Sequence, residues 1–110
     1  MSETDLVRAC VDYLRLRGAF AWRNNTGVAR LTGKGGKTRP VFYGSVGSPD
    51  VLAIMQGRFI GVECKSAKGK QSDTQVAWQE ECERAGGVYV LARDVDDVAK
   101  AIDRVAAKGE

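Results

Sequence analysis

The stretch "VGSPDVLAIMQGRFIGVECKS", residues 46–66, contains two apolar runs with a short polar break between them. The runs cover residues 51–55 and 58–64, and both are rich in aliphatic side chains. Gln56-Gly57 between them has the length and composition of a tight hairpin turn. Because both runs are apolar at successive positions, they predict central strands of a sheet that is covered by helices on each face.

Three charged side chains nevertheless border these runs, namely Asp50, Glu63 and Lys65. Charged groups are rarely buried unless they are paired or bind a metal. Glu63 and Lys65 are two residues apart and share one face of their strand. A turn at Gln56-Gly57 pairs position 50 with 63, whereas a turn at Gly57-Arg58 pairs it with 65. Either register brings the three charges to the same face and end, which predicts a site.

Two neighbouring carboxylates repel each other unless a cation lies between them. Ligation by oxygen alone suits Mg²⁺ or Mn²⁺, which binds one or two carboxylates and keeps several waters. Such an ion polarises a phosphoryl oxygen and activates water, and Lys65 would neutralise the developing charge. These residues therefore indicate phosphodiester hydrolysis. The alternative from the residues alone is that Lys65 only pairs with Glu63 while Asp50 caps a loop.

The remaining sequence predicts one α/β domain over residues 1–110, with a mixed central sheet flanked by helices. Apolar spacing, glycines and capping residues define the other elements. These are a helix ending at Gly18, a strand at 19–23, a hairpin with strands at 28–32 and 39–44, a helix from Asp73 to about Ala85, a strand at 88–92 and a helix after Asp94.

The composition excludes several classes of protein. There is no histidine, which removes histidine-dependent triads and zinc sites. The three cysteines form no C-x-x-C pair and predict reduced thiols in a cytoplasmic protein. No apolar run reaches the length of about 18 residues that a membrane span needs. Gly36-Lys37 lacks the glycine five residues earlier that a nucleotide-triphosphate loop requires, since position 31 is leucine.

Positive charge is concentrated in the first part of the chain. Residues 1–70 contain 12 basic and 5 acidic side chains, and no acid lies between Asp12 and Asp50. A one-signed stretch of this length favours a polyanionic partner, and nucleic acid is the natural one. A solvated basic loop is the alternative. The candidate DNA contacts are Arg23, Arg30, Lys34, Lys37, Arg39, Lys68 and Lys70.

The motifs in this order resemble a known family. Pro49-Asp50 followed by Glu63-Cys64-Lys65 is similar to the signature of PD-(D/E)XK nucleases, whose restriction-endonuclease-like core has the expected arrangement of elements. The wider pattern resembles the VRR-NUC branch, the virus-type replication-repair nucleases. The further matching features are Glu3, Arg23-Asn24, Gly27, Gly47-Ser48 and Gln75-Val76-Ala77-Trp78. The resemblance implies a DNA nuclease of a bacterial or phage-infected cell.

The resemblance also implies roles for individual residues. Asp50 and Glu63 correspond to metal ligands, and Lys65 to the catalytic lysine. Gln75 is similar to an active-site glutamine, and Glu3 to a first-helix acid that approaches the metal. The residues alone leave another role open for Gln75, because the sequence Ser-Asp-Thr-Gln at 72–75 matches a helix capping box.

The leading hypothesis is a metal-dependent endonuclease that acts on branched DNA, such as four-way junctions or flaps. A catalytically silent DNA-binding or assembly module is the rival, and a phosphodiesterase for small nucleotides is a third possibility. A homodimer is expected, because two centres in opposite orientation suit antiparallel strands. The long apolar hairpin would otherwise be exposed, unless it folds back on its own sheet.

Overall fold

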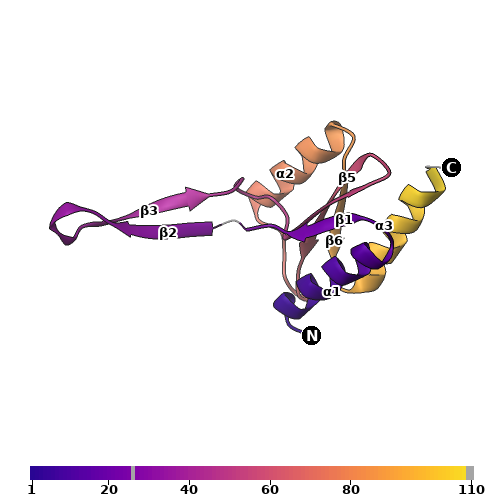
Figure 1. Ribbon diagram of the computed structural model, residues 1–110, viewed down its shortest axis with the longest axis horizontal. Helices are drawn as coiled ribbons and strands as arrows, with labels where there is room; N and C mark the ends of the chain where they lie inside the picture. Colours follow the sequence, from indigo (N-terminus) through magenta and orange to yellow (C-terminus); the bar gives the residue numbers. More distant parts are fainter. Residues whose placement is uncertain (26, 109–110) are drawn as a thin grey trace.

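The two central strands, β4 (Val51–Met55) and β5 (Arg58–Cys64), form the middle of a four-stranded sheet in the computed structural model, which describes residues 1–25 and 27–108 (Figure 1). The strand order is β1-β4-β5-β6, with β1 at Phe20–Arg23 and β6 at Val88–Ala92. β6 runs parallel to β5, whereas the other pairs are antiparallel. The predicted mixed sheet is confirmed.

The turn between β4 and β5 decides the register of the site. Met55 pairs with Arg58 and Val51 with Val62, so Gln56-Gly57 is a two-residue turn. Both turn residues have positive φ angles, 52° at Gln56 and 76° at Gly57, as a type I′ turn requires. The first of the two registers considered from the sequence is therefore the one adopted, and it continues to place position 50 opposite 63.

Three helices cover this sheet. α1 (Glu3–Leu16) and α3 (Val95–Lys108) pack on one face and on each other, and α2 (Asp73–Arg84) lies on the opposite face (Figure 1). The first and last helices begin with side-chain caps: the Ser2 hydroxyl accepts the Asp5 amide, and the Asp94 carboxylate accepts the Asp97 amide. None of these helices is long and apolar enough to cross a membrane within the described residues.

The core lies between the sheet and the α1–α3 layer. It includes Leu14, Ile60, Val62 and Ile102, which are fully buried. Cys10 and Cys64 also lie in this core with their sulfurs 4.0 Å apart, and both are free thiols. These two thiols are therefore core groups, while Cys82 on α2 is only half-buried.

The expectation that β4 is covered on both faces is wrong. Trp78 of α2 packs beside Phe59 and Tyr89, so α2 covers the β5–β6 half of its face. The β1–β4 half is left open, with Phe20 69% exposed and its cross-strand partner Ile54 44% exposed. A single helix is about 10 Å wide and covers about two strands spaced about 4.8 Å apart, which is the physical reason for this difference.

The second sheet is the predicted hairpin, formed by β2 (Gly27–Thr32) and β3 (Thr38–Tyr43) with a short 3₁₀ turn, η1 (Lys34–Gly36), at its tip. It projects far from the four-stranded sheet and its helices (Figure 1). The molecule as a whole measures 60 × 31 × 24 Å along its principal axes. The alternative of a hairpin folded back on its own sheet is therefore not what the structure shows.

Candidate active site

The predicted charged residues lie at the carboxyl end of β5. Val62 points into the core beneath α1, so alternation along the strand turns Glu63 to the other face, towards α2. Glu63 is only 3% exposed and is the one charged residue among the buried side chains of the described chain. Asp50 lies beside it, immediately before β4. The structure thus brings together the two carboxylates that the sequence placed at one end of the sheet.

Asp50 is held by the backbone on both sides. Its Oδ2 accepts the amide of Cys64 at 2.8 Å, and its backbone carbonyl accepts the amide of Asn24, also at 2.8 Å. The Asn24 side chain donates to Ser48 Oγ at 2.7 Å and to the Pro49 carbonyl at 2.9 Å. Asn24 therefore fixes the loop that presents Asp50, a role that the sequence did not reveal beyond the match at Arg23-Asn24.

Close packing against α2 and β5 also fixes the loop before Asp50. Gly47 has a φ of 83°, and a Cβ atom there would lie 2.4 Å from the carbonyl oxygen of Thr74 at the start of α2. Pro49 is fully buried, and a Cβ atom on Gly61 would come within 2.8 Å of its ring. The Trp78 indole also donates to Ser45 Oγ at 3.2 Å. These contacts explain why small residues and proline occupy the loop before Asp50.

Gln75 completes the capping box of α2 and also contacts Glu63. Its Oε1 accepts the Ser72 amide at 2.9 Å, and the Ser72 hydroxyl accepts the Gln75 amide, which completes the capping box of α2. Its Nε2 donates to Glu63 Oε2 at 3.1 Å. One side chain therefore caps the helix and also orients a buried carboxylate. Because α2 starts at this point, its first turn is fixed against the site.

Lys65 completes the constellation. Its Nζ lies 3.7 Å from Glu63 Oε2, and its side chain is mostly buried. This ion pair is the contact expected from the simplest alternative, but it occurs beside a second carboxylate rather than in isolation. The lysine therefore faces a site that already contains two acidic groups.

The two neighbouring carboxylates, Asp50 and Glu63, favour a bound cation or a proton at Glu63. Burial, and then the neighbouring Asp50 carboxylate, raise the pKa of Glu63 to about 7, and Lys65 only partly opposes them. In the described part of the chain, Asp50 Oδ2 and Glu63 Oε2 accept hydrogen bonds from N–H groups, and the two carboxylates lie close enough to hydrogen-bond to each other when one is protonated. This oxygen donor set fits a hard divalent cation such as Mg²⁺ or Mn²⁺.

Comparison with known proteins bears on the fold that carries this site. No protein-family model matches the sequence, and no curated protein matches it. A solved structure described as a "VRR_NUC domain" superposes with a TM-score of 0.63 over 94% of this chain and 97% of that chain, at 19% identity. The chain has the fold of a VRR-NUC domain. The fold expected from the sequence is therefore confirmed at the level of structure.

Within this VRR-NUC fold, Glu3 lies at the start of α1, near the end of β5. Its Oε2 accepts the amide of Ser66 at 3.2 Å, just beyond the end of β5. Over residues 1–25 and 27–108 no group of three acidic, cysteine or histidine side chains is close enough to share a metal ion. Glu3 thus lies near the site, and its role as a metal ligand stays a prediction. It ties the start of α1 to the backbone beside Lys65.

The predicted DNA contacts do not form one patch on the VRR-NUC fold. Arg30, Lys34, Lys37 and Arg39 lie on the projecting hairpin, and all four are exposed. Lys68 and Lys70 lie in the loop between β5 and α2, where Arg93 donates to the carbonyls of Ser66 and Gly69. Arg23 lies at the end of β1. The basic residues therefore fall into three groups, on the hairpin, in the loop between β5 and α2, and at the end of β1.

Replacing Gly47 with alanine should destabilise the fold and misplace Asp50. A left-handed residue with a side chain costs about 1–2 kcal/mol before the clash with Thr74 is counted, so a loss of at least about 2 kcal/mol is expected. Gly33→Ala is the matched control, because its φ is −98° and its nearest new contact is an ordinary 3.8 Å. Urea unfolding of both variants measures the effect. Equal stability of the two would contradict the packing described for Gly47.

Replacing Glu63 with glutamine should stabilise the metal-free protein at high pH. The pKa of Glu63 is about 7 in the folded protein and about 4.5 when unperturbed, so between these values only the folded chain retains the proton. Folding stability then falls as the pH rises from about 4.5 to about 7, and the full penalty remains above it. Glu63→Gln removes the penalty and should raise Tm by several degrees at pH 8, with little change at pH 4.

Glu80→Gln is the control for this measurement, because Glu80 is exposed on α2. Thermal unfolding in the presence of a chelator is the readout for both variants. A Glu63→Gln protein that loses the same stability at pH 4 and pH 8 would show that its carboxylate is not strained in the folded state.

Proposed function

We propose that this chain is a metal-dependent nuclease of the VRR-NUC family that hydrolyses DNA phosphodiester bonds. The observation that carries the proposal is the convergence of Asp50, Glu63 and Lys65 at one strand end, with Gln75 bonded to the buried Glu63. A structural ion pair would need only one carboxylate beside the lysine. The VRR-NUC fold over nearly the whole chain supports the same function.

The proposed chemistry assigns one task to each side chain. Asp50 and Glu63 would hold Mg²⁺ or Mn²⁺, which polarises a phosphoryl oxygen and lowers the pKa of a bound water. Lys65 Nζ would donate to the attacking water or to the phosphate oxygen that gains charge. Gln75 keeps Glu63 oriented through its amide, while the Cys64 amide and Asn24 hold Asp50 in place.

The projecting hairpin supports the proposal that the substrate is DNA, and branched DNA in particular. Its exposed basic residues extend the positive surface well away from the carboxylates (Figure 1). A cleft for a small nucleotide would have no use for such an arm. An extended arm can contact a second helix of a junction or flap while the scissile strand lies at Asp50. Phosphate contacts of this kind position DNA without reading its sequence.

Asp50→Ala and Glu63→Ala should each abolish cleavage, while DNA binding persists or becomes tighter because a negative charge near phosphate is removed. Lys65→Ala should lower the cleavage rate by about 10²-fold or more but retain metal binding. The assay is cleavage of a panel of junctions, flaps, nicked and plain duplexes with Mg²⁺ or Mn²⁺. Ca²⁺ should support binding without efficient cleavage, since its coordination is longer and looser.

Glu80→Ala is the control for these variants and should cleave at the wild-type rate, because its carboxylate is exposed on α2. Wild-type cleavage by Asp50→Ala would refute the assignment of this residue as a metal ligand. DNA binding by the wild-type protein without cleavage of any substrate in the panel would support the rival function, a silent DNA-binding or assembly module.

Neutralising Lys34, Lys37 and Arg39 together should weaken DNA binding and flatten its dependence on salt. Each lost phosphate contact lowers the slope of log affinity against log salt by about 0.9, so a change of up to about three units is expected. Fluorescence anisotropy with the Lys65→Ala background measures binding without cleavage. A triple variant at Lys100, Arg104 and Lys108 on α3 is the charge-matched control. An unchanged slope would mean that the hairpin tip is only a solvated loop.

We further propose that the working unit is a homodimer. The open half of the α2 face exposes Phe20 and Ile54 side by side, and Leu31 on the hairpin is also exposed. A second chain could cover these groups and supply a second centre in the opposite orientation. Light scattering at micromolar concentration should give about twice the chain mass of 11.9 kDa. A monomer that still nicks branched DNA would refute the dimer but not the nuclease.

A further inference from the structure

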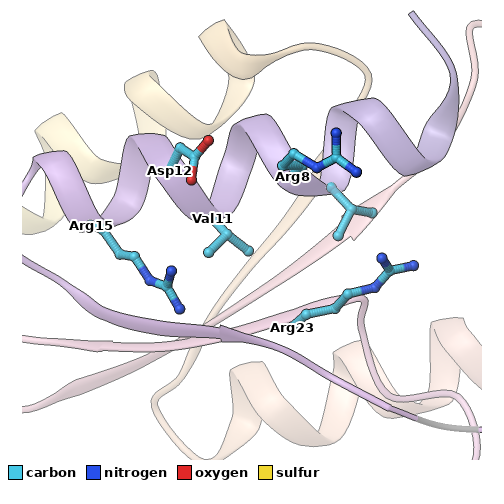
Figure 2. Close-up of a pocket in the computed structure, with 6 residues that line it drawn as sticks. Arg8, Val11, Asp12, Arg15 and Arg23 are labelled. Atoms are coloured by element: carbon cyan, nitrogen blue, oxygen red, sulfur yellow. The ribbon is translucent and has the colours of Figure 1, made fainter.

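A concave site lies between α1 and β1, on the other face of the sheet from the carboxylates (Figure 2). This α1–β1 pocket has a volume of about 250 Å³. Figure 2 shows Arg15 reaching down from the helix at one end of the pocket, Arg8 extending along the helix, and Arg23 lying across from the helix at the strand. The lining residues are Val7, Arg8, Val11, Asp12, Arg15 and Arg23.

The α1–β1 pocket has an unbalanced charge. Three arginines and one acidic residue, Asp12, are among the residues that line it. In the part of the chain that the structure describes, none of these four groups takes part in an ion pair. Three positive groups converging on one cavity repel one another, so the arrangement favours an anion between them.

The arrangement follows from the helix period and from the sheet edge. Arg8, Asp12 and Arg15 are four and three residues apart, so they share one face of α1. Arg15 Nε donates to the carbonyl of Ala21 at 3.1 Å, which satisfies one group of the free edge of β1 and holds the guanidinium at the pocket wall. Arg8 makes no hydrogen bond within the described residues, so all its donors are available to a ligand.

The pocket is close to the candidate active site but on the other face of the sheet. Arg23 pairs with Val51, the residue after Asp50, so both sites lie at the same end of the sheet. Val51 points into the core beneath α1, and its partner Arg23 points to that side as well. Since β1 is the edge strand, a nucleic-acid strand could pass from one site to the other around this edge.

We propose that the α1–β1 pocket binds a phosphate group of the DNA, one other than the phosphate that is cleaved. The inference rests on the proposed function in taking DNA as the ligand. A guanidinium group binds phosphate through two parallel, charge-assisted hydrogen bonds. Three arginines around one cavity therefore suit a phosphate that is bound by more than one guanidinium group. The phosphate could be an internal phosphodiester or a strand end, and both offer the same oxygens.

Two substitutions of opposite sign test the pocket. Arg8→Gln removes an exposed guanidinium and should weaken DNA binding by about tenfold, with a salt slope lower by about 0.9. Asp12→Asn removes the only opposing charge and should tighten binding by several-fold. Arg104→Gln on α3 is the matched control and should change neither value. Binding is measured by anisotropy in the Lys65→Ala background with Ca²⁺, so no cleavage is required.

The choice of DNA identifies the source of the phosphate. A closed dumbbell has no strand ends, so persistence of the Arg8→Gln effect on it assigns the pocket to an internal phosphodiester. An effect confined to 5′- or 3′-phosphorylated duplexes assigns the pocket to a strand end. The inference is overturned if Arg8→Gln matches Arg104→Gln on every substrate, or if Asp12→Asn fails to tighten binding.

A spectroscopic readout separates this inference from the proposed function. The Nε–H signals of Arg8, Arg15 and Arg23 are followed by NMR during titration with a short 5′-phosphorylated oligonucleotide in the absence of divalent metal. Shifts of these signals support the pocket even if the protein never cleaves DNA. Unshifted pocket signals overturn the inference, even if the Asp50-dependent cleavage is intact.

Discussion

The turn at Gln56-Gly57 is the constraint on which the site depends. Because side chains alternate along strands, a slip of one residue in the β4–β5 pairing would move β5 side chains to the wrong face relative to Asp50. The positive φ angles of both turn residues hold the pairing at Met55 with Arg58. The positions of Asp50 opposite Glu63, and of Val51 and Val62 in the core, follow from that register.

The site also shows how a small domain can keep two carboxylates together. Glu63 is buried beside Asp50, so its charge costs folding free energy, and the structure offsets only part of that cost through Lys65 and Gln75. The rest of this folding free-energy cost is offset by packing and hydrogen bonds elsewhere. Examples are the packing of Pro49 on Gly61 and the hydrogen bond of Asn24 to the loop before Asp50. An ordinary structural ion pair would not require this reinforcement.

The sequence was sufficient to predict the elements, the mixed sheet and the grouping of Asp50, Glu63 and Lys65. The elements follow from the local spacing of apolar residues. The grouping follows from the alternation of side chains along the two paired strands of a hairpin. The sequence could not reveal the hydrogen bonds of Asn24 to Ser48 and Pro49, because residues 24 and 25 positions apart meet only after the sheet forms. The partial coverage by α2, the direction of the hairpin and the position of Glu3 depend in the same way on packing between distant segments.

The double role of Gln75 has a consequence for natural or laboratory variation of this chain. Because one amide both starts α2 and holds Glu63, a substitution there changes helix initiation and the carboxylate geometry together. Gln75→Glu would preserve the capping acceptor but set a third negative charge against Glu63. Lys65 has no backbone partner for its ammonium in the described residues, so it can vary with less structural effect. A substitution at position 75 therefore changes two properties at once, the start of α2 and the geometry of Glu63. A substitution at position 65 can alter the charge at the site with less effect on folding.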